Sequence, residues 1–427
     1  MKTSRLMPPT PPSSTSRLKE NEFELLCALA GANLSPLRLE RLAGWNLTAV
    51  DWKEFLRLAE HHGVLPLAAR NLTGDLTAHP TNHPANHPAN QDRSEPGEIE
   101  TSRRLPPEVE RSLRSSYEAN LRRNLWFTAE LVRIIRHFER RQLPAIPYKG
   151  PALAQSLYGD VGLRSFSDLD FLISPPDFER AKRILSEIQY RPAADLAPPV
   201  ERFWLKNGYE RSFDGADGKN LVELQWALLP HFYAVDACRG ELSMENLLQR
   251  AGRTTVGGCQ VLCLSPEDSL LVLCLHAAKH LWTRLIWLVD IAETLRLLVD
   301  HALVASRARV LGIARILGVS FWLVNNVLHE ELPQFAQEMI AVDPRVSALG
   351  REFAARVARA TPYDFESTEY FRMIMRLRER PSHRYRYLWS LISTPGASDL
   401  ATVRLPEMLF PLYRIVRVGR LLRKTLF

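Results

Sequence analysis

The sequence has few of the features that mark secreted, zinc-binding or membrane-spanning proteins. It contains five cysteines in 427 residues, with no Cys-x-x-Cys pair and no His or Cys pair at zinc-finger spacing near Cys259 and Cys263. An odd number of cysteines and no apolar signal segment indicate a reducing compartment, so we expect a cytoplasmic protein. No uncharged apolar run reaches about 18 residues, so we expect no membrane span.

Two segments have compositions typical of disorder. Residues 1–19 are basic and proline-rich and have no apolar stretch like that of a signal peptide, so we predict a disordered leader. Residues 76–104 contain a near-repeat of Asn-His-Pro-Ala, which predicts a disordered insertion. His79, His83 and His87 recur at four-residue steps, but the proline after each one prevents a helix from stacking them. A linker is therefore favoured over a metal site.

The charge of the chain is mildly basic, with a formal net charge of +7. Such a balance permits an anionic partner but does not require one. The last predicted helix carries Arg414, Arg417, Arg420 and Arg423 at three-residue spacing. This series leaves RNA or an anionic membrane surface open as a partner, and a solvated helix face is the plainer explanation.

The remaining sequence divides into three regions by the period of its apolar residues. Residues 20–75 and 265–427 show apolar residues at three- and four-residue steps, which predicts helices in both regions. Residues 105–264 begin with a long helix over about 106–140 and continue as strand, helix, strand, helix and hairpin. The order predicts an α+β protein with a sheet in the middle and helical regions at both ends.

Two acidic residues lie in the second predicted strand of the middle region. Asp168 and Asp170 are two positions apart in the run SDLDFLI, so their side chains project from the same face while Leu169 points to the other. Two adjacent carboxylates repel each other unless a cation lies between them. Their oxygens suit Mg²⁺ or Mn²⁺, which accept carboxylate, phosphate and water ligands. The pair therefore predicts a divalent metal site.

A candidate phosphate-binding step precedes the two acids. Lys149 and Gly150 stand where a predicted strand gives way to a helix, and glycine allows a phosphate to approach the backbone closely. A helix N-terminus supplies N–H groups and the positive end of a dipole, to which Lys149 adds a charge. A surface-exposed strand end is the structural alternative for Lys149.

A third acid, Glu223, lies in the apolar run LVELQW of the last hairpin strand. If that strand lies beside the one carrying Asp168 and Asp170, three carboxylates converge and suffice for a two-metal site. The alternative is a structural ion pair between Glu223 and Lys206 or Arg211.

A second candidate group lies in the helical region after residue 265. The group consists of His276, Lys279, His280 and Arg284. On a helix, residues 276, 280 and 284 share one face and residue 279 lies beside it. They are candidates for lining a nucleotide cleft, and the polar edge of a packed helix is the favoured alternative for any single one. Asp290 is expected to pair with one of these bases or to lie in a buried polar network.

The runs YKG, SDLDFLI, VELQW and LHAAKHLW…LVDIA together resemble the uncharacterised nucleotidyltransferase family NTP_transf_5, of the DNA polymerase β-like superfamily. The resemblance implies a nucleotidyltransferase-fold mixed sheet. It places Lys149 and Gly150 on the family's Lys-Gly step. It also identifies Arg164 as the recurrent arginine, which is either a phosphate contact or an anchor for the loop.

The same resemblance places the metal-binding acids on Asp168 and Asp170 and the later acid on Glu223. Two departures from the wider superfamily are evident. Gly150 is followed by Pro151 rather than by Ser or Gly, and 18 positions separate Gly150 from Asp168, which is a longer spacing.

The function implied is metal-dependent transfer of a nucleoside monophosphate from an NTP to a hydroxyl of an unidentified acceptor. The alternative is a non-catalytic nucleotide-binding scaffold or sensor whose basic C-terminal helix binds RNA, a membrane or a protein. Retention of all three acids favours the enzyme.

Overall fold

The computed structural model describes residues 14–74, 105–215, 218, 221–228, 240–297, 299–360, 364, 367–393, 399, 403 and 405–426. The predicted insertion lies outside these residues. The first helix begins at Ser14, so it includes the last residues of the predicted leader. The N-terminal helices are α1 (Ser14–Leu29), α2 (Pro36–Ala43), α3 (Trp52–His61) and α4 (Leu65–Thr73).

The middle region forms a five-stranded mixed sheet in the order β1-β2-β5-β4-β3. Only the β2–β5 pair is parallel, and the other neighbouring strands are antiparallel. A separate hairpin of β6 and β7 lies beside the edge strand β1. The strands are β1 (Ala145–Pro147), β2 (Asp168–Ile173), β3 (Arg191–Pro192), β4 (Glu210–Asp214), β5 (Leu221–Gln225), β6 (Gly252–Val256) and β7 (Cys259–Cys263).

Helices cover the sheet unequally on its two faces. Leu169 and Phe171 of β2 and Val222 of β5 point into one hydrophobic core with α5 and α7. The opposite face carries the three acids and is approached by the C-terminal helices. The helices of this region are α5 (Pro107–Arg140), α6 (Gly150–Tyr158), α7 (Phe178–Glu187), α8 (Pro198–Asn207) and α9 (Met244–Arg250).

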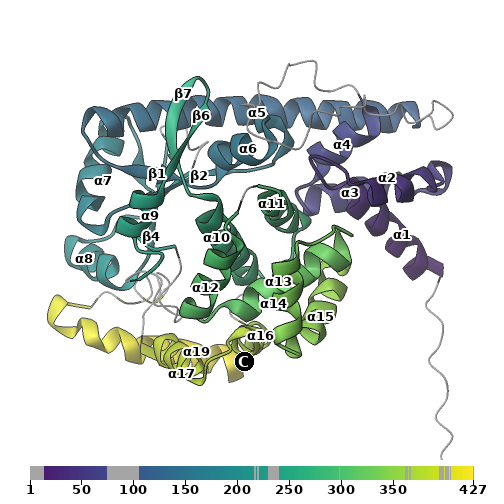
Figure 1. The fold of residues 1–427 in the computed structure, drawn as a ribbon. Helices are drawn as coiled ribbons and strands as arrows, with labels where there is room; N and C mark the ends of the chain where they lie inside the picture. The colour runs from purple at the N-terminus through teal and green to yellow at the C-terminus, as the bar shows by residue number, and fades with distance from the viewer. Residues whose placement is uncertain are drawn as a thin grey trace, which may run out of the picture.

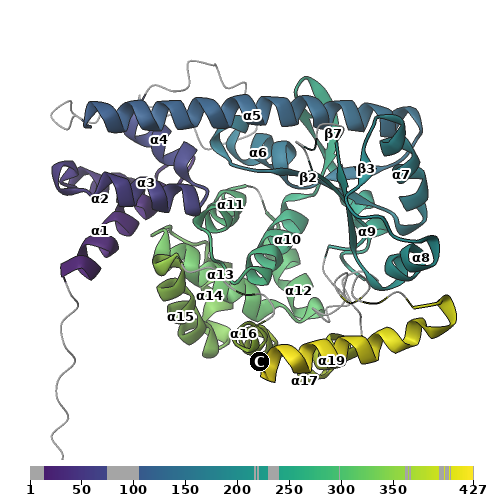
Figure 2. The same cartoon turned by 180° about the vertical axis from the view of Figure 1, so that it is seen from behind.

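Helix α5 connects the sheet to the N-terminal helices. Its 34 residues span roughly 50 Å at 1.5 Å per residue, and it runs along one side of the molecule from α4 to α7 (Figures 1 and 2). Leu113 near its start packs in the core of the N-terminal helices, whereas Phe138 near its end packs on the sheet. One helix thus contributes to both hydrophobic cores.

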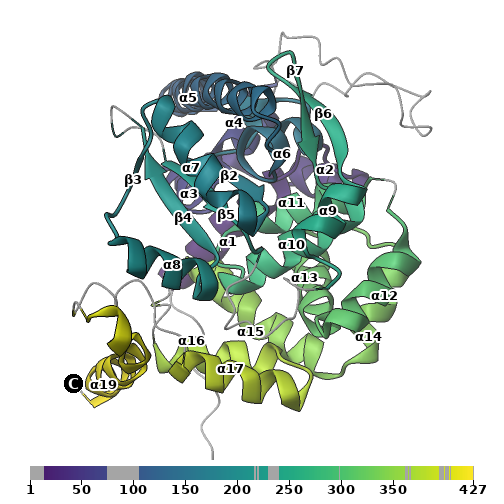
Figure 3. The ribbon, with the colours of Figure 1, turned by 90° about the vertical axis from the view of Figure 1, so that its left-hand side faces the viewer.

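The C-terminal region is helical and lies opposite α5 (Figure 1). Helix α19 lies next to α8 (Figure 3), where Phe410 and Tyr413 pack against Phe203. The helices are α10 (Pro266–Lys279), α11 (Leu285–Leu295), α12 (His301–Leu311), α13 (Ala314–Val327), α14 (Gln334–Val342), α15 (Arg345–Arg359), α16 (Thr368–Leu377), α17 (Pro381–Ser393) and α19 (Tyr413–Leu426).

The helix expected after Ser265 is interrupted in the structure. Ser265 caps it, accepting a hydrogen bond from the Asp268 backbone N–H. Helix α10 nevertheless ends at Lys279, and Leu281 and Trp282 take left-handed conformations with φ of 51°. The strain is tolerated because the Trp282 side chain is fully buried and donates a hydrogen bond to Ser320.

Within the described part of the chain, none of the helices has both the length and the apolar character needed to span a bilayer. The predicted basic series on α19 is partly engaged inside the protein. Arg417 and Arg420 both pair with the buried Asp399, at 2.8 and 2.7 Å. Arg414 and Arg423 are exposed to solvent.

Candidate active site

The parallel pairing of β2 with β5 brings the three predicted acids together. Asp170 lies opposite Glu223 in the register of the two strands, and Asp168 shares the same face two positions earlier. Asp170 is only 2% exposed, whereas Asp168 and Glu223 are partly buried. The expected convergence of the two strands is therefore present in the structure.

A lysine that follows the edge strand β1 places its positive charge beside these acids. Tyr148, just after β1, donates its backbone N–H to the Asp170 carbonyl at 3.3 Å and so extends the strand pairing. Lys149 follows, with its ammonium 3.3 Å from the Asp170 carboxylate and 4.8 Å from the centre of the Tyr148 ring. The lysine is thus a counter-charge for the acids and does not stand as a solvated strand end.

Gln225 is a member of the site that the sequence analysis missed. Its amide nitrogen donates to Asp170 and to Glu223, each at 3.0 Å, and its amide oxygen accepts from the Tyr148 hydroxyl at 2.7 Å. The two-residue period of a strand places Gln225 on the same face as Glu223, and that spacing was the available signal. For Tyr148, the sequence offered no sign of a place in the site other than its position directly before Lys149.

Gly150 opens helix α6 in a conformation suited to glycine. Its φ is +57°, and a Cβ atom at this position would lie 3.2 Å from the Asp168 carbonyl oxygen. Lys149 is the extended N-cap residue, and Pro151 is in the first turn. The helix N-terminus therefore starts against the strand that carries the acids, which is the setting the sequence predicted for a phosphate-binding step.

The electrostatics of the group follow from its burial and from the spacing of its charges. Burial, and then the negative charge of Asp170, raises the pKa of Glu223 to about 8. Burial and Asp170 also raise the pKa of Asp168. Burial acts to lower the pKa of Lys149, but the attraction of Asp170 and of neighbouring groups outweighs it and the pKa rises. An added cation would therefore stabilise the ionised forms of Asp168 and Glu223.

Helix α10 presents part of the second candidate group to the same site. Burial lowers the pKa of Lys279, while the charges of Glu210, Glu223 and Asp170 act in the opposite direction, so the ammonium lies within electrostatic reach of the acids. Its amine is 3.4 Å from the Tyr209 hydroxyl. The structure thus brings Lys279 toward the acids.

The two histidines of this group pack against an aromatic ring. The rings of His276 and His280 are 4.8 Å apart, and both contact Trp287. Burial lowers the pKa of His280 to about 3 and lowers the pKa of His276 as well, so both side chains are neutral at neutral pH. The shared helix face predicted for Arg284 is wrong, because α10 ends at Lys279 and Arg284 caps the start of α11.

Arg164 is anchored in a buried polar network. Its guanidinium donates to both carboxylate oxygens of Asp290, at 3.0 and 2.9 Å, and the Tyr158 hydroxyl donates to Asp290 at 2.7 Å. The side chains of Arg164 and Asp290 are 7% and 0% exposed. The contacts favour the anchor role over a phosphate contact. They also fulfil the expectation that Asp290 lies in a buried network.

A cavity of about 910 Å³ lies beside β1 and shares Tyr148 with the site. Tyr148 lines it and also faces the acids, and the remaining walls come from α6, the β6–β7 hairpin and the start of α10. Its polar lining includes Gln155, Ser156, Thr254 and Ser269. The volume is in the range of pockets that hold small molecules.

The donor set fits a divalent metal in its chemistry. Within the described residues, no three His, Cys, Asp or Glu side chains already stand in an arrangement that would hold a metal ion. Lys149 and Gln225 instead donate to oxygens of the acids, while Asp170 Oδ2 is buried and has no hydrogen-bond partner. A buried carboxylate oxygen without a partner is costly, and a hard cation is the partner it suits best.

Comparison with known proteins identifies the chain at the level of its family. Residues 48–329 match a family of nucleotidyltransferases, described as uncharacterised. The chain belongs to this family, NTP_transf_5. The matched region runs from the N-terminal helices through the sheet to α13 and contains every residue of the site. No curated protein and no solved structure matches the chain.

Proposed function

We propose that the protein is a Mg²⁺-dependent nucleotidyltransferase that transfers a nucleoside monophosphate from an NTP to a hydroxyl of an acceptor and releases pyrophosphate. The observation that carries the proposal is the pairing of Asp170 with Glu223 across two parallel strands, with Lys149 at 3.3 Å from Asp170. Membership of the nucleotidyltransferase family supports the use of an NTP.

The triphosphate would be held by the start of α6. Lys149 supplies a positive charge and Gly150 leaves the backbone open to close approach by phosphate oxygens. Asp168, Asp170 and Glu223 would hold the metal. Bound Mg²⁺ or Mn²⁺ supplies neutralisation of the phosphate charge and activation of the acceptor hydroxyl.

In the reaction the acceptor oxygen forms a bond to the α-phosphorus, and the bond from that phosphorus to the pyrophosphate oxygen breaks. Glu223, kept ionised by the charge of the bound cation, would take the proton of the acceptor hydroxyl. The 910 Å³ cavity is our candidate site for the acceptor, because it has a polar lining and Tyr148, which lines it, donates a hydrogen bond to Gln225 beside the acids. Losing one of the acids should lower the rate by several orders of magnitude.

The test is calorimetric titration with ATP, GTP, CTP and UTP in turn, in Mg²⁺ and in EDTA. The compared proteins are the native chain, the Asp168→Ala/Asp170→Ala variant and a matched Asp195→Ala/Asp214→Ala variant that removes two exposed aspartates of the same region. The proposal predicts a Mg²⁺-dependent component of binding that only the first variant loses. If that component is absent from the native chain, or survives in the first variant, the acids are not a metal–nucleotide site.

A further inference from the structure

A second pocket lies in the C-terminal helices, beyond the region that the family match covers. It has a volume of about 490 Å³ and is lined by residues of α15, α16 and α17. Four of its seven lining residues are arginines, and none is acidic. The lining residues are Arg345, Ala348, Leu349, Arg372, Met375, Arg376 and Arg384.

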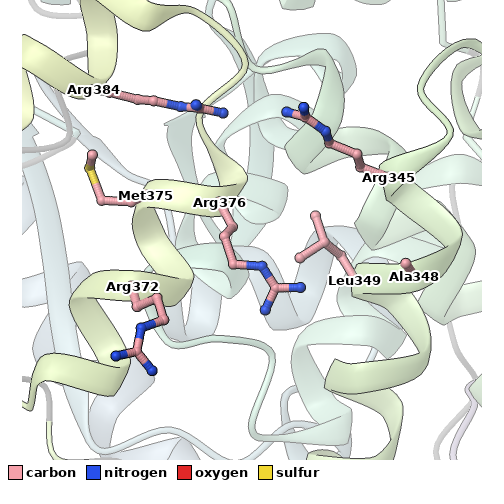
Figure 4. Close-up of a pocket in the computed structure, with 7 residues that line it drawn as sticks. All are labelled: Arg345, Ala348, Leu349, Arg372, Met375, Arg376 and Arg384. Carbon is pink, nitrogen blue, oxygen red and sulfur yellow. The ribbon is translucent and has the colours of Figure 1, made fainter.

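Helical spacing directs these arginines to one place. Arg372 and Arg376 are four residues apart on α16 and so share a face, as do Arg345 and Leu349 on α15. Arg384 comes from α17. Figure 4 shows the side chains of Arg345 and Arg384 extending toward each other from opposite sides of the pocket.

The charges of these arginines are poorly compensated within the protein. The guanidiniums of Arg345 and Arg372 make no hydrogen bond or ion pair with any described residue, and the acid within electrostatic reach of Arg345, Asp343, already pairs with Arg315. Among the described residues, the one hydrogen bond that Arg384 donates from its side chain runs from Nε to the Arg378 carbonyl, at 3.1 Å. The Arg376 guanidinium pairs with the Glu352 carboxylate at 2.7 Å, but the two side chains are 43% and 34% exposed. Such a surface pair contributes little and exchanges readily.

Four guanidiniums around one concavity repel each other, and a multiply charged anion would relieve the repulsion. Arginine also matches phosphate by donating two parallel hydrogen bonds. The pocket has the volume of a small-molecule site and is concave, whereas a nucleic acid backbone needs an extended groove. The buried side chain of Leu349 supplies an apolar wall between the arginines.

We propose that this pocket binds a small molecule carrying several phosphate groups, without a metal and separately from the site on the sheet. Inorganic polyphosphate and nucleotides share this chemistry. The proposal does not rest on the proposed transferase activity, because the acids and Lys149 take no part in it.

The test is calorimetric titration in EDTA with inorganic tripolyphosphate and, separately, with ATP. The variant is Arg345→Ala/Arg372→Ala. The control is Arg351→Ala/Arg359→Ala, which removes the same charge from exposed positions of α15 that do not line the pocket. We expect binding by the native chain, about tenfold weaker binding by the variant and unchanged binding by the control. Tighter binding of ATP than of tripolyphosphate would identify a nucleotide as the ligand, and the reverse would identify inorganic polyphosphate.

Several results would overturn the proposal. The first is no binding of either probe to a native chain whose circular dichroism shows it to be folded. The second is an equal loss in the variant and the control, which would mean diffuse attraction by the overall charge. The third is loss of the metal-free binding in the Asp168→Ala/Asp170→Ala protein. Displacement of tripolyphosphate by short single-stranded RNA at lower concentration than by ATP would instead assign the surface to RNA.

Discussion

Replacing Asp290 with alanine would leave the Arg164 guanidinium buried without its carboxylate partner. The change removes the acceptor of hydrogen bonds from Arg164 and of the one from Tyr158. An unpaired buried charge costs about 3–5 kcal/mol, and we expect the free energy of unfolding to fall by that amount. Arg164→Met should cost less, because Tyr158 still donates to Asp290.

The assay is urea denaturation followed by tryptophan fluorescence. The surface pair of Arg141 and Glu187 supplies a matched control, because its nitrogen–oxygen distance is 2.7 Å but its side chains are 56% and 46% exposed. Glu187→Ala should change stability by less than about 1 kcal/mol. The difference between the two losses of stability isolates the effect of burial, because the nitrogen–oxygen distances of the two pairs are similar.

The double variant Arg164→Met/Asp290→Leu separates the two roles considered for Arg164. If the arginine is an anchor, replacing both charges with apolar groups should recover part of the lost stability and most of the Mg²⁺-dependent NTP binding. If Arg164 contacts phosphate, NTP affinity stays low in every variant without the arginine. A loss below about 1 kcal/mol in Asp290→Ala, or a double variant as unstable as the sum of the singles, would refute the anchor argument.

Three further outcomes are expected for residues in and around the group of acids. Folding raises the pKa of Glu223 from 4.5 to about 8, so the native chain loses stability as the pH rises through this range. In EDTA, the melting temperature of Glu223→Gln should therefore exceed that of the native chain above pH 8 and equal it below pH 4.5. Lys149→Met should weaken Mg²⁺-dependent NTP binding about tenfold by calorimetry, and a normal affinity would exclude its phosphate role. Gly150→Ala should lower the free energy of unfolding, measured by urea denaturation, by about 1–2 kcal/mol, because the φ of Gly150 is positive and the new Cβ would crowd the Asp168 carbonyl. An unchanged midpoint of the urea transition would contradict this expectation.

The sheet and its acids could be predicted because their signals are local. Alternation along a strand decides which side chains share a face, so Asp168 and Asp170 were expected together from their spacing alone. Placing Glu223 beside them required a guess that two strands far apart in sequence are neighbours. The family resemblance supported that guess, and the register now shows Glu223 opposite Asp170.

The break between α10 and α11 could not be predicted because its cause is non-local. The run from His276 to Asp290 contains no glycine or proline and keeps apolar residues at helical spacing, which favours one continuous helix. Leu281 and Trp282 adopt positive φ because burying Trp282 against α13 and Phe353 offsets the strain. The sequence carries no local sign of that contact.

The break has a direct consequence for the site. By ending α10 at Lys279, it leaves the lysine at a helix C-terminus facing the acids, where the helix dipole favours a positive charge. Lys149 approaches the same acids from the end of β1 and lies over the Tyr148 ring. Two lysines from separate regions of the chain thus lie near the three carboxylates, and burial raises the pKa values of Asp168 and Glu223. Crowding like charges together in a buried place costs stability, and it suits a site that receives an anionic substrate together with a cation.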